Sequence, residues 1–124
     1  MTDRELADAV RTYIDRVVNR RDITAVDECV SQRYRGSGLD WPTDRETLRR
    51  FYEKQYADRP HWHIDVQETV ELGDSVVARA LAGGPVVVDG TAVTKRLEWL
   101  AHYRLQDGLI TEINLLSVVP LADG

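Results

Sequence analysis

The spacing of apolar residues changes halfway along the chain, and this change restricts the possible folds more than any other feature of the sequence. Before Pro60, apolar residues recur every three to four positions, as they do on one face of an amphipathic helix. From His61 to Val119, apolar and polar residues alternate, which is typical of strands with one covered face. Because the helices precede the strands and do not alternate with them, the sequence predicts an α+β domain.

Two helices are predicted near the start of the chain. The first covers roughly residues 3–20, and Thr2 and Glu5 have the spacing of a capping box at its beginning. Its apolar stripe consists of Leu6, Val10, Tyr13, Ile14, Val17 and Val18. The second helix is shorter and begins at Asp22 or Thr24.

A third helix is predicted after a segment rich in turn-forming residues. Residues 34–42 contain two glycines and a proline, so we expect a short strand or a loop there. Thr43 and Glu46 again have capping-box spacing, which marks the start of the third helix. One side of this helix carries Leu48, Phe51, Tyr52, Gln55 and Tyr56. Pro60 follows its end.

Four strands are predicted in the second half, joined as an antiparallel meander. They cover residues 61–72, 75–88, 93–105 and 109–119. The segment Gly83-Gly84-Pro85 interrupts the second of these strands. Asp89-Gly90 and Asp107-Gly108 are typical two-residue hairpin turns, so each joins its neighbouring strands directly.

Two-residue turns also fix which residues face each other across the strands. They predict Ala80 opposite Trp99, and Ala101 opposite Ala78 on one side and Asn114 on the other. One face of the sheet then collects Ala78, Ala80, Trp99, Ala101, Tyr103, Asn114, Leu116 and Val118. The opposite face collects Val77, Arg79, Leu81, Leu100, His102, Arg104, Ile113 and Leu115. Both faces are largely apolar, so we expect the helices to cover one and a second copy of the chain to cover the other.

Size, charge and cysteine content exclude several classes of protein. The 124 residues fit a single domain over 1–124, and the net charge of −5 argues against a large nucleic-acid interface. The sequence has neither an apolar run long enough to span a membrane nor a secretory signal at its start. Cys29 is the single cysteine, which indicates a reducing compartment. We therefore expect a cytoplasmic protein with no nucleic-acid or membrane partner.

Five segments of the chain carry a resemblance to a known superfamily. They are YIDRV at 13–17, DITAV at 22–26, DRETLRRFY at 44–52, LGDSVVAR at 72–79 and YRLQDGLITE at 103–112. In this order they resemble the nuclear transport factor 2-like superfamily, and within it the SnoaL-like polyketide cyclases and ketosteroid isomerases. The resemblance implies three N-terminal helices packed on a strongly curved antiparallel sheet, a cone-shaped cystatin-like α+β barrel that encloses a pocket. It also implies a homodimer through the outer face of the sheet.

The resemblance further implies two catalytic residues. Tyr13 occupies the place of the tyrosine that donates a hydrogen bond to the oxyanion in the isomerases. Asp40 is the nearest counterpart of their catalytic aspartate, although an alignment to the cyclases places Ser37 there instead. A carboxylate beside Trp41 could have a raised pKa and act as a general base, while Tyr13 stabilises an enolate oxygen. Two other acid/base positions of the family fall on Ala101 and on Ser117 or Val118.

Seven residues are predicted to bind the substrate: Trp41, Trp62, Trp99, Asn114, Tyr56, Ala101 and His63. The tryptophans offer flat apolar walls, and a small residue such as Ala101 in the middle of the sheet leaves space between them. Asn114 would be a buried amide facing the ligand, and His63 an acid or base at the mouth of the pocket. His61 and His63 share a strand face that Asp65 continues, but no further histidine or cysteine supports a site there, so we expect no metal.

These observations leave three functions open. The first is a cofactor-free acid/base enzyme of the cyclase or isomerase type, acting on a hydrophobic small molecule that bears a carbonyl group. The second is a non-catalytic protein that binds such a molecule in the same pocket. The third is a dimeric interaction module whose pocket is filled by its own side chains. The first two predict an open cavity and the third predicts none.

Overall fold

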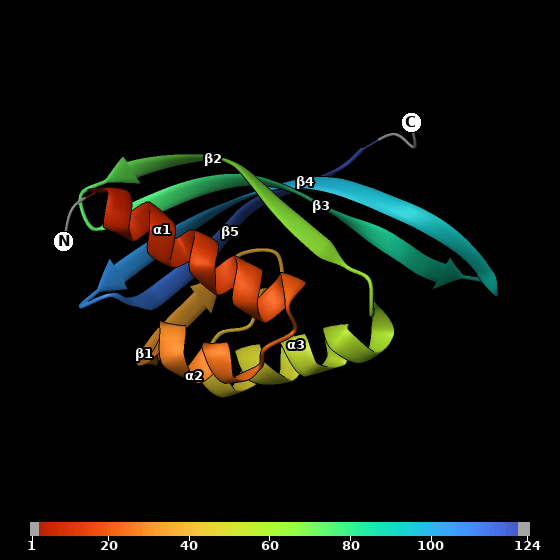
Figure 1. The fold of residues 1–124 in the computed structure, drawn as a ribbon, viewed down its shortest axis with the longest axis horizontal. Helices are drawn as coiled ribbons and strands as arrows, with labels where there is room; N and C mark the ends of the chain where they lie inside the picture. The colour runs from red at the N-terminus through yellow and green to blue at the C-terminus, as the bar shows by residue number, and fades with distance from the viewer. Residues whose placement is uncertain (1–2, 122–124) are drawn as a thin grey trace.

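The computed structural model describes residues 3–121, and its helices lie on one side of a curved five-stranded sheet (Figure 1). This arrangement confirms the α+β class and the packing of N-terminal helices on a curved sheet. The elements in chain order are α1 (Asp3–Ile14), the π-helical segment η1 (Asp15–Asn19), α2 (Thr24–Cys29), β1 (Val30–Ser37), α3 (Arg45–Asp58), β2 (His63–Leu72), β3 (Ser75–Val88), β4 (Thr91–Gln106) and β5 (Leu109–Pro120).

The sheet is mixed, which differs from the purely antiparallel sheet that we expected. Its strand order is β1-β5-β4-β3-β2, and the last four strands form the predicted antiparallel meander. β1 pairs in parallel with β5, and β1 and β2 are the two edges, so the sheet is open and does not close into a barrel. In β1 only Val30 and Tyr34 are buried, and this spacing lacks the alternation by which a strand is recognised in a sequence.

The first predicted helix consists of two parts. α1 ends at Ile14 and continues as η1, where the Arg20 amide donates to the Asp15 carbonyl at 2.9 Å, five residues back. Asn19, at the end of η1, holds the edge strand β2 with two hydrogen bonds to the backbone of Ile64, of 2.9 Å to its carbonyl and 2.8 Å from its amide. The wider helical turn therefore lies where the helices meet the edge of the sheet.

The start of α3 differs by one residue from the predicted capping box. Asp44 is the N-cap, and its carboxylate accepts a hydrogen bond from the Thr47 amide at 2.7 Å. This bond lowers the pKa of Asp44 below its ordinary value. Thr43 precedes the cap, and its carbonyl accepts from the Gly36 amide at 3.0 Å, which ties the loop before α3 to β1.

The register between β3 and β4 confirms the prediction from the Asp89-Gly90 turn. Ala80 lies opposite Trp99 and Ala78 lies opposite Ala101. The pairing continues without a shift through Gly83, Gly84 and Pro85, so the predicted interruption does not disturb the hairpin.

The register between β4 and β5 does not follow the turn arithmetic. It shifts by one residue between Arg104 and Leu105, and again between Leu100 and Ala101. Ala101 therefore lies opposite Leu115, and Asn114 lies opposite His102 on the face away from the helices. β-Bulges insert unpaired residues that a turn sequence does not reveal, so the predicted pairing of Ala101 with Asn114 is wrong.

The bulges also change which residues of β5 reach the core. Ile113 is buried and Leu115 packs against the core, although both were predicted on the outer face. Leu116, predicted on the inner face, is 51% exposed. None of the helices within residues 3–121 has the length and apolar character that a membrane crossing requires.

Candidate ligand pocket

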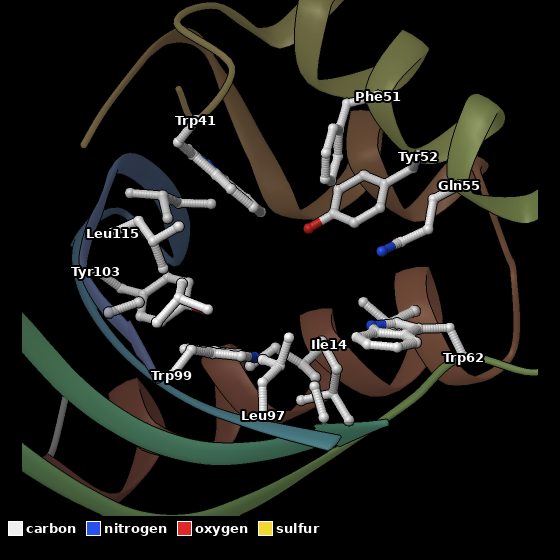
Figure 2. Close-up of a pocket in the computed structure, with 16 residues that line it drawn as sticks. Ile14, Trp41, Phe51, Tyr52, Gln55, Trp62, Leu97, Trp99, Tyr103 and Leu115 are labelled. Carbon is white, nitrogen blue, oxygen red and sulfur yellow. The ribbon is translucent and has the colours of Figure 1, made fainter. Parts of the chain in front are cut away.

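A cavity of about 140 Å³ lies between the helices and the concave face of the sheet (Figure 2). We call it the aromatic cavity, and its sixteen lining residues come from helical, loop and strand segments. They are Ile14, Val18, Trp41, Phe51, Tyr52, Gln55, Trp62, Ile64, Ala82, Leu97, Trp99, Ala101, Tyr103, Ile113, Leu115 and Val118. The space is therefore unfilled by the chain itself, as the two small-molecule hypotheses require.

Six of the sixteen lining residues are aromatic. Trp41 and Phe51 pack with their ring centroids 5.1 Å apart, and Trp99 and Tyr103 with theirs 6.4 Å apart. The guanidinium of Arg59 lies 4.8 Å from the ring centroid of Trp62, which is a cation–π contact. Rings offer large flat contact areas with few rotatable bonds, so such walls suit flat apolar ligands.

Trp41 is held in place by a hydrogen-bond chain through Tyr34. The indole N–H of Trp41 donates to the Tyr34 hydroxyl at 2.9 Å, and that hydroxyl donates to the Pro42 carbonyl at 3.0 Å. Gly36 lies against this chain, and a Cβ at this position would approach the Pro42 carbonyl to 1.9 Å and the Tyr34 hydroxyl to 2.3 Å. The close approach of the loop to β1 therefore requires glycine at position 36.

Small residues on the sheet leave the space that the cavity occupies. Ala82 on β3 and Ala101 on β4 are both buried and line the cavity opposite the aromatic residues of α3. Larger side chains there would extend into the cavity from its floor. Because close-packed interiors rarely leave such space, a pair of alanines at the centre of a curved sheet favours a ligand site.

Two polar side chains of α3 point into the cavity. Figure 2 shows the hydroxyl of Tyr52 and the side-chain amide of Gln55, both on α3, directed towards its centre. The Tyr52 hydroxyl also forms a hydrogen bond of 2.9 Å with the hydroxyl of Tyr13, which is 1% exposed. Burial raises the pKa of both hydroxyls well above the ordinary tyrosine value, so both are protonated at neutral pH.

The structure brings four of the predicted site residues together around the cavity. Trp41, Trp62, Trp99 and Ala101 all line it. Tyr13 lies one layer behind, where it contacts the cavity through Tyr52.

Tyr56 forms a contact between two helical segments. Its hydroxyl donates to the carbonyl of Val17 in η1, and burial raises its pKa to about 12. This contact joins α3 to the π-helical segment η1, and Tyr56 is not among the residues that line the cavity.

The other predicted site residues lie outside the cavity. Asp40 is exposed in the turn after β1, with a positive φ of 62°. Asn114 lies on the outer face, where its side chain accepts from Ser37 at 2.5 Å and contacts His102 Nδ1 at 2.9 Å. His63 is exposed at the start of β2 and pairs with Asp65 at 2.9 Å.

Several lining residues were not named as site residues from the sequence. Tyr52 and Gln55 lie on the apolar side of the predicted third helix, so their helical spacing already indicates that they face the interior of the protein. Leu115 could not be found in this way because the bulges in β5 reverse its predicted face. Among residues 3–121, no cluster of three histidine, cysteine, aspartate or glutamate side chains is arranged to hold a metal ion.

Solved structures with the same fold are similar to nearly the whole chain. A cystatin-fold protein from Novosphingobium aromaticivorans has a TM-score of 0.78 at 14% identity, covering 91% of this chain and 97% of its own. IdmH from Streptomyces antibioticus, a proposed polyketide cyclase, has a TM-score of 0.77 at 21% identity over 90% of each chain. AclR from Streptomyces galilaeus, a proposed hydroxylase, has a TM-score of 0.80 at 15% identity, covering 95% and 81%.

These likenesses concern the fold, since one architecture carries proposed activities as different as cyclisation and hydroxylation. No curated protein matches the sequence at a significant level. The sequence model of the SnoaL-like domain, in contrast, matches residues 10–113, which is most of the chain. This chain therefore belongs to the SnoaL-like domain family.

Proposed function

We propose that this protein binds a hydrophobic small molecule in the aromatic cavity. The observation that carries the proposal is an unfilled space of about 140 Å³ whose walls include Trp41, Trp62 and Trp99. Burial of aromatic and aliphatic ligand surface against such walls is favourable by roughly 25 cal/mol per Å². A module that only interacts through its surface would gain nothing from leaving this space empty, because unfilled space loses packing contacts.

Acid/base chemistry on a carbonyl-bearing substrate is the second candidate. It is favoured by the Tyr13–Tyr52 pair, whose hydroxyls can donate to an oxygen that gains negative charge. Proposed polyketide cyclases among the proteins of the same fold support the same chemistry. We place binding first because the polar groups of the lining are hydroxyls, indole N–H groups and an amide, while Asp40 lies exposed outside it. The catalytic role of Asp40 stays a prediction.

Xenon is a suitable probe of the cavity because it enters apolar cavities without needing a specific chemical group. We expect xenon to shift the NMR signals of residues around the cavity, and Ala101→Leu to remove these shifts by filling the space. Ala92→Leu, at an exposed position on the same strand, is the matched control and should leave them unchanged. Equal xenon shifts in the wild type and in folded Ala101→Leu would contradict the proposal.

We also propose that two copies associate through the outer face of the sheet in the cytoplasm. The helices lie on the other side of the sheet (Figure 1), and this face carries half-buried Val77 and Leu100. Leu116, which β4 leaves unpaired beside them, is exposed. Apolar residues grouped on an open sheet face support a second copy as the cover. Sedimentation at micromolar concentration tests this association.

A further inference from the structure

We propose that the aromatic cavity accommodates one ring of a neutral ligand whose carbonyl oxygen accepts a hydrogen bond from Tyr52, with Tyr13 acting as a positioning residue. This inference rests on the proposed function, which requires only that the cavity binds a hydrophobic small molecule. It adds the size, the charge and the orientation of that molecule.

The size follows from the volume of the cavity. At about 140 Å³ it is close to the apolar cavity of roughly 150 Å³ that binds benzene in another protein, and well below the 300–1,000 Å³ or so of drug-sized pockets. One six-membered ring fits a space of this volume, and two fused rings fill it less well. Phe51 and Val118 are the most exposed lining residues, at 36% and 39%, so the cavity is open to solvent on the sides that they line, and a substituent on the ring can reach solvent there.

The direction of the hydrogen bond follows from the burial of Tyr13. Among the described residues, the hydrogen-bond partner of the Tyr13 hydroxyl is the Tyr52 hydroxyl. Tyr13 is also buried from solvent. If Tyr52 donated to Tyr13, the Tyr13 proton would have no acceptor among the hydrogen bonds of the described residues, which is unfavourable for a buried donor. Tyr13 therefore donates to Tyr52, and the proton of Tyr52 is left to point into the cavity.

A proton that points into the cavity selects a ligand with an acceptor at that position. Figure 2 shows the amide of Gln55, one helical turn from Tyr52 at the same side of the cavity, and it can donate a second hydrogen bond to the same oxygen. A carbonyl oxygen has two lone pairs and can accept both.

The charge of the ligand follows from the chemistry of the lining. All sixteen lining side chains are uncharged at neutral pH, because fourteen of them have no ionisable group and burial raises the pKa of the two tyrosines further above neutrality. Transfer of a carboxylate into such surroundings is strongly unfavourable without a paired cation. A neutral ketone, ester or amide on a single ring satisfies the cavity, and the corresponding acid does not.

Acetophenone and ethylbenzene test the hydrogen bond, since they differ at the carbonyl group. We expect Tyr52→Phe to weaken acetophenone binding about 3- to 10-fold in an NMR titration, as the loss of one hydrogen bond predicts, and to leave ethylbenzene binding unchanged. Retained ethylbenzene binding also shows that the variant is folded. Equal effects of Tyr52→Phe on both probes would overturn the inference while leaving the proposed function intact.

2-Acetylnaphthalene and benzoate test size and charge. The naphthyl ketone is more apolar than acetophenone, so hydrophobicity alone predicts tighter binding, whereas the cavity volume predicts weaker binding. Benzoate should bind more weakly than acetophenone at pH 7. If either compound binds more tightly than acetophenone, the inference is wrong in that respect. If acetophenone, ethylbenzene and xenon all fail to bind, the proposed function itself is wrong.

The infrared carbonyl band of bound acetophenone tests the role of Tyr13. A hydrogen bond from Tyr52 lowers the frequency of this band, and donation from Tyr13 strengthens that bond by polarising the Tyr52 hydroxyl. We expect Tyr13→Phe to raise the frequency of the band part of the way towards that of acetophenone without this hydrogen bond. Tyr52→Phe should raise the frequency further. An unchanged band in folded Tyr13→Phe would show that Tyr13 is a packing residue and would overturn its assigned role.

Discussion

The buried pair of tyrosine hydroxyls leads to an unequal effect of two similar substitutions on stability. Tyr52→Phe removes the partner of a sealed hydroxyl, so the Tyr13 hydroxyl is left buried without a hydrogen bond. An orphaned buried donor costs about 1–3 kcal/mol, so we expect the free energy of unfolding to fall by that amount. Tyr13→Phe leaves the Tyr52 hydroxyl facing the cavity, where water or ligand can bond to it, and should cost only about 0.5–1.5 kcal/mol.

The double variant separates this explanation from a general loss of packing. With both hydroxyls removed, no donor is orphaned, so the double variant should lose less than the sum of the single losses, and about as little as Tyr13→Phe alone. Urea denaturation with unchanged m-values is the assay. A loss for Tyr13→Phe equal to or larger than that for Tyr52→Phe would refute the reasoning, because it would place the sealed hydroxyl on Tyr52.

Three further predictions concern the loop, a helix start and the outer face. Gly36→Ala should destabilise the protein by about 2–4 kcal/mol in urea denaturation, because the added Cβ meets the Pro42 carbonyl; an unchanged midpoint would contradict this. Asp44→Ala should lower the melting temperature at pH 7. Since the pKa of Asp44 is lowered in the folded state, its contribution exists above the ordinary aspartate pKa and is lost as the pH falls through the folded value, so the two melting curves should converge in acid. Leu116→Asp should convert a sedimenting dimer into a monomer, and a wild type that already sediments as a monomer would rule out the association.

The fold was predictable because its signals are local. The change of hydrophobic period placed the helices before the strands, and the Asp89-Gly90 turn fixed the pairing of Ala80 with Trp99. The parallel strand β1 was not predictable as such, because it pairs with residues about 80 positions away and buries only Val30 and Tyr34. Its position at the far edge of the sheet depends on how α2 and α3 pack, which the local pattern does not encode.

The candidate site was predictable where large and small apolar residues carry the signal. The three tryptophans and Ala101 line the cavity. The predicted polar residues did not gather there. Asn114 was assigned to the inner face by a register that ignored the bulges, and Asp40 was placed by resemblance at a turn that the structure exposes. Polar residues are harder to place because one residue of register shift moves a side chain to the other face of a sheet.

The two irregularities of β5 have a consequence for the shape of the molecule. Thr111 and Leu116 are the residues that β4 leaves unpaired, so a chain lacking both would keep Ile113 and Leu115 turned inward. Such a chain would nevertheless have a straighter last strand, because bulges bend the strand that carries them and increase its twist. The sheet would then be less concave, and the space on its concave face would shrink although every residue that lines the cavity were retained. The volume available to a ligand in this molecule thus depends on backbone curvature as much as on the side chains that line the cavity.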